Sequence, residues 1–203
     1  MTRVLVATRN AGKFRELVPM LSAGGWQAID LPTAGVVEAP HEAAMESHST
    51  FEANALAKAR HFFSISGIPT LADDSGLCID ALDGRPGVHS KRWSGRADLD
   101  GHVLDEANNA MLLAALAPSD PRGAAYVCAA AYVDDDDEVV CRGETRGRLL
   151  LAPRGEGGFG YDPYFWSAEL AATFAEVTRE EKARVSHRAR AVSAILEALR
   201  ARR

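Results

Sequence analysis

The sequence predicts an α/β protein built on a mixed sheet. Short apolar runs typical of strands alternate with helix-like spacing early in the chain, which favours parallel strands joined by helices. A long hairpin pattern in the middle of the chain adds antiparallel strands. The 203 residues contain no repeat, low-complexity tract or linker, and this length suits one sizeable core or two lobes on one sheet. We therefore expect a single domain over residues 1–203.

The first part of the chain alternates between strand and helix patterns. Strands are predicted at Arg3–Thr8 and Trp26–Leu31, and helices at Gly12–Leu21 and Phe51–Ile65. Pro19 has no backbone N–H, so we expect it to kink or shorten the first helix. The segment Thr33–Ser49 has mixed polarity without a clear period, which is typical of a loop. Gly67 and Pro69 then end the second helix.

The later part of the chain combines a hairpin with further helices. We expect strands at Ile68–Ala72 and Leu77–Leu82 on either side of a DDSG turn, a glycine- and proline-punctuated loop at Gly84–Gly95, and a helix at Leu99–Leu116. Two apolar runs predict a hairpin around Asp134–Asp137, whose acidic tip is interpreted as an exposed turn. Thr178, followed three residues later by Glu181, has the pattern of a capping box and opens a long helical stretch.

Composition excludes several classes of function. The chain has 28 acidic and 23 basic residues without a basic stripe, so a long nucleic-acid polymer is not an expected partner. No apolar run is long enough for a signal peptide or a membrane span. Cys78, Cys128 and Cys141 lie in apolar stretches without paired spacing, which predicts reduced core thiols in a cytoplasmic protein.

Two adjacent carboxylates, Asp73 and Asp74, follow an apolar run and lead directly into Ser-Gly. A turn explains them, because Asp, Ser and Gly are common turn residues. A strand end that presents carboxylates to a metal ion and a water molecule explains them as well. Taken alone, these residues favour the turn.

A candidate anion site lies at Ala7–Lys13 (ATRNAGK), at a strand-to-helix junction. Helix N-termini attract phosphate through unpaired N–H groups, and a bound anion would stabilise Lys13, whose charge opposes the helix dipole there. The segment is not a Walker A loop, because the leading glycine is missing and Phe14 follows the lysine. A solvated lysine at a frayed helix start is the alternative.

Three further segments have residues suited to binding chemistry. Glu46 precedes the Phe51 helix, and Lys58 lies near the apolar face of that helix, where it either reaches solvent or points into a cleft. The glycine-rich segment around Phe159 and Asp162 is either a tight turn or a stacking surface for a nucleobase.

The last of these segments is KARVSHRARA, which contains Lys182, His187 and Arg188. At 3.6 residues per turn, Lys182 and His187 would point about 140° apart on a straight helix. Either the helix breaks near Ser186 or these residues form a polar surface, and the polar surface is favoured for each residue taken singly.

Six segments together resemble one known family. They are ATRNAGK (Ala7–Lys13), TFEANALAKA (Thr50–Ala59), ADDSGLCIDAL (Ala72–Leu82), GRPGVHSKRWSG (Gly84–Gly95), GEGGFGYDPYF (Gly155–Phe165) and TREEKARVSHRARA (Thr178–Ala191). Their order and spacing are similar to those of the inosine/xanthosine triphosphate pyrophosphatases, the Ham1-like enzymes that remove non-canonical purine nucleotides. The resemblance extends from Val4 to Leu199 and changes the interpretation of Asp73–Asp74 from a turn to a catalytic pair.

The resemblance implies an α/β, mixed-sheet fold of two lobes around a central cleft, in a cytoplasmic homodimer. It implies Mg²⁺-dependent hydrolysis of ITP, dITP and XTP between the α and β phosphates, giving the monophosphate and pyrophosphate. Such a reaction keeps these nucleotides out of DNA and RNA. The expected partner is a small nucleotide, with no nucleic-acid polymer and no membrane.

The same resemblance assigns roles to individual residues. Asp74 is the catalytic base, and Glu46 and Asp74 hold Mg²⁺, with Asp73 as a candidate third ligand. The residues expected to cradle or neutralise the phosphates are Thr8, Arg9, Asn10, Ala11, Gly12, Lys13, Lys58, Ser75 and Lys182. Those expected around the base are Phe159, Gly160, Tyr161, Asp162, His187 and Arg188. His187 and Arg188 suit the C6 carbonyl of hypoxanthine and xanthine, because both can donate a hydrogen bond that the adenine amine cannot accept.

Some residues depart from the family pattern, and two other functions stay open. A second acidic residue is common where this chain has Ala53, and His89, Lys91 and Trp93 differ from the usual loop residues. These differences concern the shape of the site. The alternatives are a regulator that binds the triphosphate without cleaving it and a pyrophosphatase directed at pyrimidines. The Asp73–Asp74 pair argues against the first, and the residues around the base argue against the second.

Overall fold

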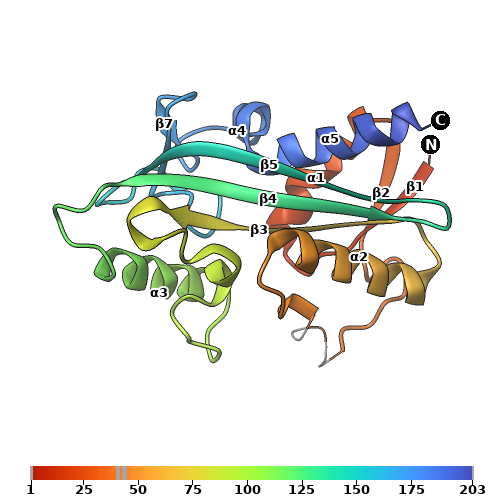
Figure 1. Cartoon of the computed structure of the whole chain (residues 1–203), viewed down its shortest axis with the longest axis horizontal. Helices are drawn as coiled ribbons and strands as arrows, with labels where there is room; N and C mark the ends of the chain where they lie inside the picture. Colours follow the sequence, from red (N-terminus) through yellow and green to blue (C-terminus); the bar gives the residue numbers. More distant parts are fainter. Residues whose placement is uncertain (1, 40–41, 43–44, 203) are drawn as a thin grey trace. The chain divides into compact units, whose positions relative to one another are not determined.

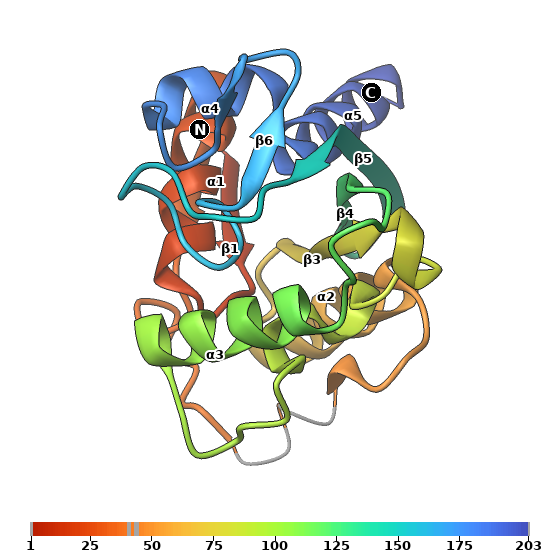
Figure 2. The same cartoon turned by 90° about the vertical axis from the view of Figure 1, so that its left-hand side faces the viewer.

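The computed structural model describes residues 2–39, 42 and 45–202. Its strands are β1 (Thr2–Val6), β2 (Trp26–Ile29), β3 (Thr70–Ile79), β4 (Gly123–Val133), β5 (Glu138–Leu149), β6 (Phe165–Ser167) and β7 (Ala172–Thr173). They form one sheet in the order β2-β1-β3-β4-β5-β6-β7 (Figure 1). β1 pairs in parallel with β2 and β3, and β6 pairs antiparallel with β5 and β7. Figure 2 shows β6 beside the end of β5. The predicted α/β class with a mixed sheet is therefore confirmed.

The helices lie close to the predicted ranges. They are α1 (Ala11–Ala23), α2 (Phe51–Ser66), α3 (Gly101–Ala114), α4 (Arg179–Val185) and α5 (His187–Ala201), with 3-10 turns at Asp80–Leu82 and Gly87–Arg92. In the described residues, no helix combines the length and apolar character that crossing a membrane requires. The three cysteines are free thiols, and Cys128 is fully buried.

The chain divides into two compact units. The first comprises Met1–Asp74, Cys128–Gly143 and His187–Arg203, and the second comprises Ser75–Val127 and Glu144–Ser186. In the first unit, α1 and α5 lie against each other (Figure 1) and bury an apolar core with the strands. Trp26 and Tyr132 meet edge to face in this core, with ring centroids 5.4 Å apart. The core fixes the start of α1 and of α5.

The second unit has its own aromatic core. The ring of Tyr126 on β4 packs edge-on against Phe165 at 4.7 Å and stacks on Phe174 at 5.7 Å. Leu112 on α3 and Leu77 on β3 belong to the same cluster. This core supports the turn between β5 and β6 that contains the predicted base-binding residues.

The predicted DDSG turn is wrong, because β3 continues through it without a break. Gly76 is required for close approach and not for a turn: a Cβ there would lie 2.2 Å from the carbonyl oxygen of Gly87. Successive side chains of a strand point to opposite faces. Asp73 and Asp74 therefore project from opposite faces of β3, a separation that a turn would not have imposed.

Further expectations concern α1 and the C-terminal helical stretch. Pro19 does not shorten α1, which continues to Ala23, and Pro19 itself is exposed on the solvent side, where water can satisfy the carbonyl that loses its partner. The C-terminal stretch does break at Ser186, whose backbone is extended, and the capping box of Thr178 and Glu181 opens α4 as predicted. The polar-surface interpretation is wrong, because Lys182, His187 and Arg188 are buried.

Candidate active site

The junction of β1 and α1 presents a capped helix N-terminus. Asn10 is the N-cap, and its Oδ1 accepts a hydrogen bond from the main-chain N–H of Lys13 at 3.0 Å. Thr8 Oγ1 accepts from the N–H of Asn10 at 3.1 Å, which fixes the turn before the helix. Arg9 binds elsewhere, donating to both carboxylate oxygens of Glu42 at 3.0 and 2.8 Å. The bonds of Thr8 and Asn10 thus hold the loop that leads into α1 and to Lys13.

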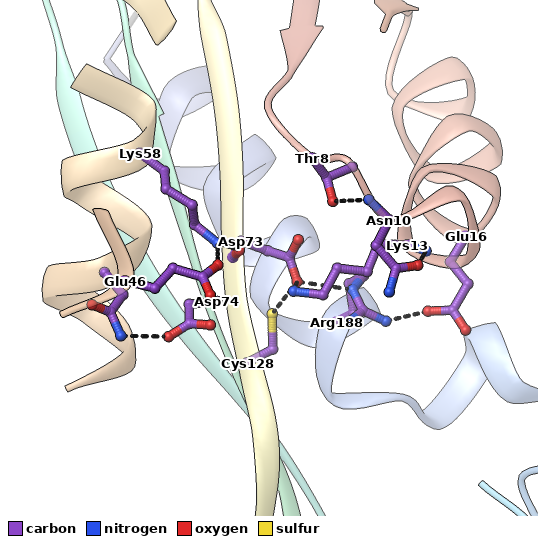
Figure 3. A network of polar contacts seen from close by, with 11 residues as sticks. Thr8, Asn10, Lys13, Glu16, Glu46, Lys58, Asp73, Asp74, Cys128 and Arg188 are labelled. Atoms are coloured by element: carbon purple, nitrogen blue, oxygen red, sulfur yellow. Dashed lines mark hydrogen bonds and ion pairs between the residues drawn. The ribbon is translucent and has the colours of Figure 1, made fainter. Parts of the chain in front are cut away.

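Asp73 is the centre of a buried ion network (Figure 3). Its Oδ2 lies 3.1 Å from Lys13 Nζ and 3.1 Å from Arg188 Nε, and the other arm of Arg188 binds Glu16. Burial would raise the pKa of Asp73, but the charges of Lys13, Arg188 and Lys58 outweigh it and hold that pKa well below its usual range. Asp73 is therefore a carboxylate that stabilises two cations. Asp73 already neutralises the charge of Lys13. From the sequence, a bound anion was expected to do so.

A second group forms around Asp74 on the opposite face of β3. Asn54 on α2 donates from Nδ2 to Asp74 Oδ2 at 2.9 Å. Lys58, one helical turn further along, donates to Glu46 Oε1 at 2.7 Å and to the main-chain carbonyl of Asp73 at 2.6 Å. Lys58 thus points into the site and not toward solvent. Figure 3 shows Glu46, Lys58 and Asp74 gathered on this side of the strand.

The electrostatics of Asp74 differ from those of its neighbour. Burial raises the pKa of Asp74, and the nearby Glu46 raises it further, while Lys58, Lys13 and Asn54 act in the opposite direction. Lys58 itself stays protonated: burial lowers its pKa, but the charges of Glu46, Asp73 and Asp74 together raise it above the usual value. The two adjacent carboxylates therefore differ in kind, one ion-paired and one more easily protonated.

The structure bears on the metal ligands as well. Within the described residues, no group of three or more His, Cys, Asp and Glu side chains is placed to hold a metal ion. Magnesium commonly takes only one or two protein carboxylates and completes its shell with phosphates and waters. Asp73 is engaged with Lys13 and Arg188, and no described donor reaches its Oδ1. Glu46 and Asp74 stay the predicted ligands, and Asp73 stays the candidate third ligand.

The second unit holds the other group of predicted residues. Asp162 Oδ2 accepts from Lys182 Nζ at 2.6 Å and from the main-chain N–H of Phe159 at 3.0 Å. Lys182 Nζ also lies 5.1 Å from the ring centroids of Phe159 and Phe174. Lys182 was expected with the phosphate-neutralising lysines, and its described contacts are to Asp162, Phe159 and Phe174 of the second unit. The hydroxyl of Tyr161 donates to the carbonyl of Ser90 at 2.7 Å, which anchors the same turn.

The remaining predicted residues lie beside these groups. Ser75 follows Asp74 on β3 and is half-buried. His187 and Arg188 begin α5 and are buried, with Arg188 only 1% exposed. Ala11 and Gly12 form the first turn of α1, and Gly160 occupies the turn after Phe159.

Sequence reasoning missed two residues of the first unit that contact this site. Asn54 is fully buried and contacts Asp74, and Glu16 holds Arg188. Asn54 could have been found, because an amide on the same helical face as Phe51, Ala55 and Lys58 is unusual on an apolar face. Glu16 gives no comparable signal, since its partner is far away in the sequence.

The comparison with known proteins decides the family. The Ham1 family model matches residues 4–198, nearly the whole chain. The chain belongs to the Ham1 family. The resemblance inferred from the six segments is thereby confirmed.

Individual Ham1 relatives are similar over their full lengths. A protein of Ralstonia nicotianae named dITP/XTP pyrophosphatase is 45% identical, with 98% of each chain covered. The solved structure of a HAM1 protein from Coxiella burnetii has a TM-score of 0.82 and 34% identity, again with 98% of each chain covered. A nucleoside-triphosphatase / dITP/XTP pyrophosphatase from Mycobacterium abscessus has a TM-score of 0.71 and 44% identity, covering 96% of this chain and 99% of that one.

Proposed function

We propose that this Ham1 protein hydrolyses the non-canonical purine nucleoside triphosphates ITP, dITP and XTP to the monophosphate and pyrophosphate. The observation that carries the proposal is the arrangement around Asp73 and Asp74, where cations and carboxylates converge beside a capped helix N-terminus. Phosphoryl chemistry depends mainly on positioning and charge stabilisation, which such a group supplies. The names of the relatives support dITP and XTP among these substrates.

The phosphate chain is bound by the start of α1. Thr8, Asn10 and the backbone of Ala11 and Gly12 form the cradle, where helix N–H groups favour an anion. Lys13 neutralises phosphate charge, and Asp73 holds that ammonium in place. Lys58 is the second such cation, oriented by Glu46 and the main chain of Asp73.

The attacking water is oriented and deprotonated by Asp74. A general base must hold a proton for part of the reaction, and the raised pKa that burial gives Asp74 suits this task better than the lowered pKa of Asp73. Asn54 fixes the carboxylate through Oδ2. Asp73, which projects from the other face of β3, has a supporting role.

The expected cofactor is Mg²⁺, held by Glu46 and Asp74. These two carboxylates are near enough that Glu46 raises the pKa of Asp74, and a divalent cation would relieve that repulsion. When bound, the ion supplies charge neutralisation to the phosphates. The residues present therefore fit a magnesium site of the usual sparse type.

The base is bound in the second unit by the turn from Phe159 to Asp162. Phe159 offers a flat ring for stacking, and Asp162 with Lys182 presents hydrogen-bonding groups beside it. His187 and Arg188 stay predicted readers of the C6 carbonyl, although the described contacts of Arg188 go to Asp73 and Glu16. Lys182 is reassigned from the phosphates to the base. The proposal also includes a homodimer, a cytoplasmic location and one functional domain over residues 1–203.

A substrate panel tests the proposal. Purified protein with Mg²⁺ is incubated separately with ITP, dITP, XTP, ATP, GTP, dUTP and dCTP, and pyrophosphate and monophosphate are measured. Pyrophosphate from the first three at a kcat/KM far above the rest is the expected result. Tight binding of ITP without cleavage would instead favour the regulator, and a preference for dUTP or dCTP would favour the pyrimidine enzyme.

A further inference from the structure

One face of α3 holds both main-chain groups of Gly160. Asp105 Oδ2 accepts a hydrogen bond from the N–H of Gly160 at 2.7 Å. Asn109, one helical turn later, donates from Nδ2 to the carbonyl of Gly160 at 3.0 Å. Residues at i and i+4 share a helix face, so the two side chains form a clamp on a single residue.

The clamped residue lies in the turn that presents Phe159 and Asp162. Gly160 has a φ of +63°, a conformation that glycine adopts without strain. Within the turn, the Asp162 carboxylate accepts from the N–H of Phe159, and the N–H of Asp162 donates to the carbonyl of Phe159 at 3.2 Å. The clamp ties this turn to α3 at Gly160, and the Tyr161 hydroxyl, which donates to the carbonyl of Ser90, anchors the turn at a second point.

The surroundings of the turn make the clamp important. A pocket of about 580 Å³ is lined by Asp105 and Asn109 of α3 together with Gly158, Phe159 and Gly160 of the turn. The turn borders open space at Phe159 and Gly160, whereas Tyr161 packs in the buried cluster that contains Leu112 of α3. The two hydrogen bonds hold the turn at Gly160, where it borders this pocket.

We propose that Asp105 and Asn109 are positioning residues that set the base selectivity of the enzyme by clamping the Gly160 turn. The inference rests on the proposed function, since it assigns a new role beside the same base-binding turn. Neither residue is required to touch the substrate. A shifted turn changes where Phe159 stacks and where Asp162 meets the base edge, and it leaves the phosphate-binding residues of the first unit as they are.

Two isosteric substitutions separate this role from a general effect on folding. Asp105→Asn keeps an acceptor oxygen for the Gly160 N–H, whereas Asn109→Asp loses the donor and sets a carboxylate against the Gly160 carbonyl. We expect Asn109→Asp to lower the ratio of kcat/KM for ITP to that for ATP by about tenfold or more, mostly through KM. Asp105→Asn should change this kcat/KM ratio by less than about twofold, because the N–H of Gly160 keeps its hydrogen bond.

Asn108 provides a matched control. It is buried like Asn109 and also donates to a main-chain carbonyl, that of Lys91 at 3.0 Å, while accepting from the N–H of Ser94 at 2.8 Å. Asn108→Asp loses the same kind of bond at a different loop. It should lower the melting temperature as Asn109→Asp does and leave the ITP-to-ATP ratio unchanged.

Two readouts do not depend on base selectivity. Inhibition by inorganic tripolyphosphate should be equal in wild type and Asn109→Asp, because this probe has no base. Amide hydrogen exchange of the peptide containing Gly160 should accelerate in Asn109→Asp and Asp105→Ala and stay slow in Asn108→Asp. If Asn109→Asp does not fold, Asp105→Ala takes its place in these measurements. Asp105→Asn is then the control.

The outcomes are distinguishable. A wild-type protein that cleaves no purine triphosphate overturns the proposed function, and the exchange data still test the clamp. A wild type that selects ITP, with an unchanged ratio in Asn109→Asp or an equal loss in Asn108→Asp, overturns the selectivity role. Slow exchange at Gly160 in both Asn109→Asp and Asp105→Ala overturns the clamp itself.

Discussion

The side-chain amide of Asn54 donates to Asp74 Oδ2 at 2.9 Å, and its carbonyl accepts from the main-chain N–H of His48 at 2.9 Å. One fully buried side chain on α2 thus joins the proposed catalytic base to the segment that follows Glu46. Because the amide can only be satisfied in one orientation here, it fixes which oxygen of Asp74 is turned toward α2.

Asn54→Asp is expected to lower kcat for ITP by about ten- to a hundredfold, since a hydrogen bond to a charged group is lost and a second carboxylate is placed beside Asp74. The variant keeps a side-chain oxygen that accepts from the main-chain N–H of His48, so the segment after Glu46 should stay in place. Steady-state kinetics and a thermal melt check this. A kcat within twofold of wild type in the folded variant would contradict the orienting role.

Asp74→Asn tests the base directly. The amide keeps the shape of the side chain and cannot take a proton, so kcat should fall by about 10²- to 10⁴-fold. The measurement is single-turnover cleavage of ITP, which separates chemistry from product release. Near-normal turnover would exclude Asp74 as the base.

Asp73→Asn should have a different phenotype although the two residues are adjacent. Removing this charge takes the shared carboxylate from the buried Arg188 and the half-buried Lys13, at a cost on the order of 3 kcal/mol of unfolding free energy. A carboxylate whose pKa is lowered by folding adds stability above its unfolded pKa of about 4 and loses that contribution as pH falls. Denaturant unfolding should therefore show that the difference in unfolding free energy between wild type and variant becomes smaller below about pH 4. A difference in unfolding free energy that does not depend on pH would argue against the ion network.

These contrasts show what the sequence could and could not specify. The elements were predictable because helical and strand periods are local properties, and the functional segments were found as an ordered set. The continuity of β3 could not be predicted. Gly76 is explained by its close approach to Gly87, which is a tertiary contact. For the same reason, the pairing of Arg188 with Glu16 and of Lys182 with Asp162 could not be derived from spacing.

The metal assignment predicts dependence on a divalent cation. Protein treated with EDTA should lose activity and recover it with added Mg²⁺, because phosphate charge is otherwise left unneutralised. Glu46→Gln removes one of two proposed ligands and should raise the Mg²⁺ concentration for half-maximal rate by about tenfold or more. Titration of activity against Mg²⁺ measures both effects, with Glu42→Gln as a control of equal charge change at the Arg9 contact. Full activity after EDTA treatment would exclude the metal.

Gly143 connects the fold to the site at the start of α5. A Cβ at this position of β5 would lie 2.1 Å from the carbonyl oxygen of His187 and 2.5 Å from the N atom of Ala191. Both obstacles are backbone atoms that a rotamer change cannot move, so Gly143→Ala must displace the first turn of α5 or bend the strand. Overpacking of this kind costs about 1–3 kcal/mol.

The displaced turn includes His187 and Arg188, so the same variant should impair function as well as stability. We expect a lower melting temperature together with a fall in kcat/KM for ITP, because Arg188 can no longer reach Asp73 and Glu16 together. Asp136→Ala, in the exposed turn between β4 and β5, is the control and should change neither quantity. Thermal melts and ITP kinetics on both variants measure the effect. Wild-type stability and activity in Gly143→Ala would show that α5 can move away from β5 at little cost.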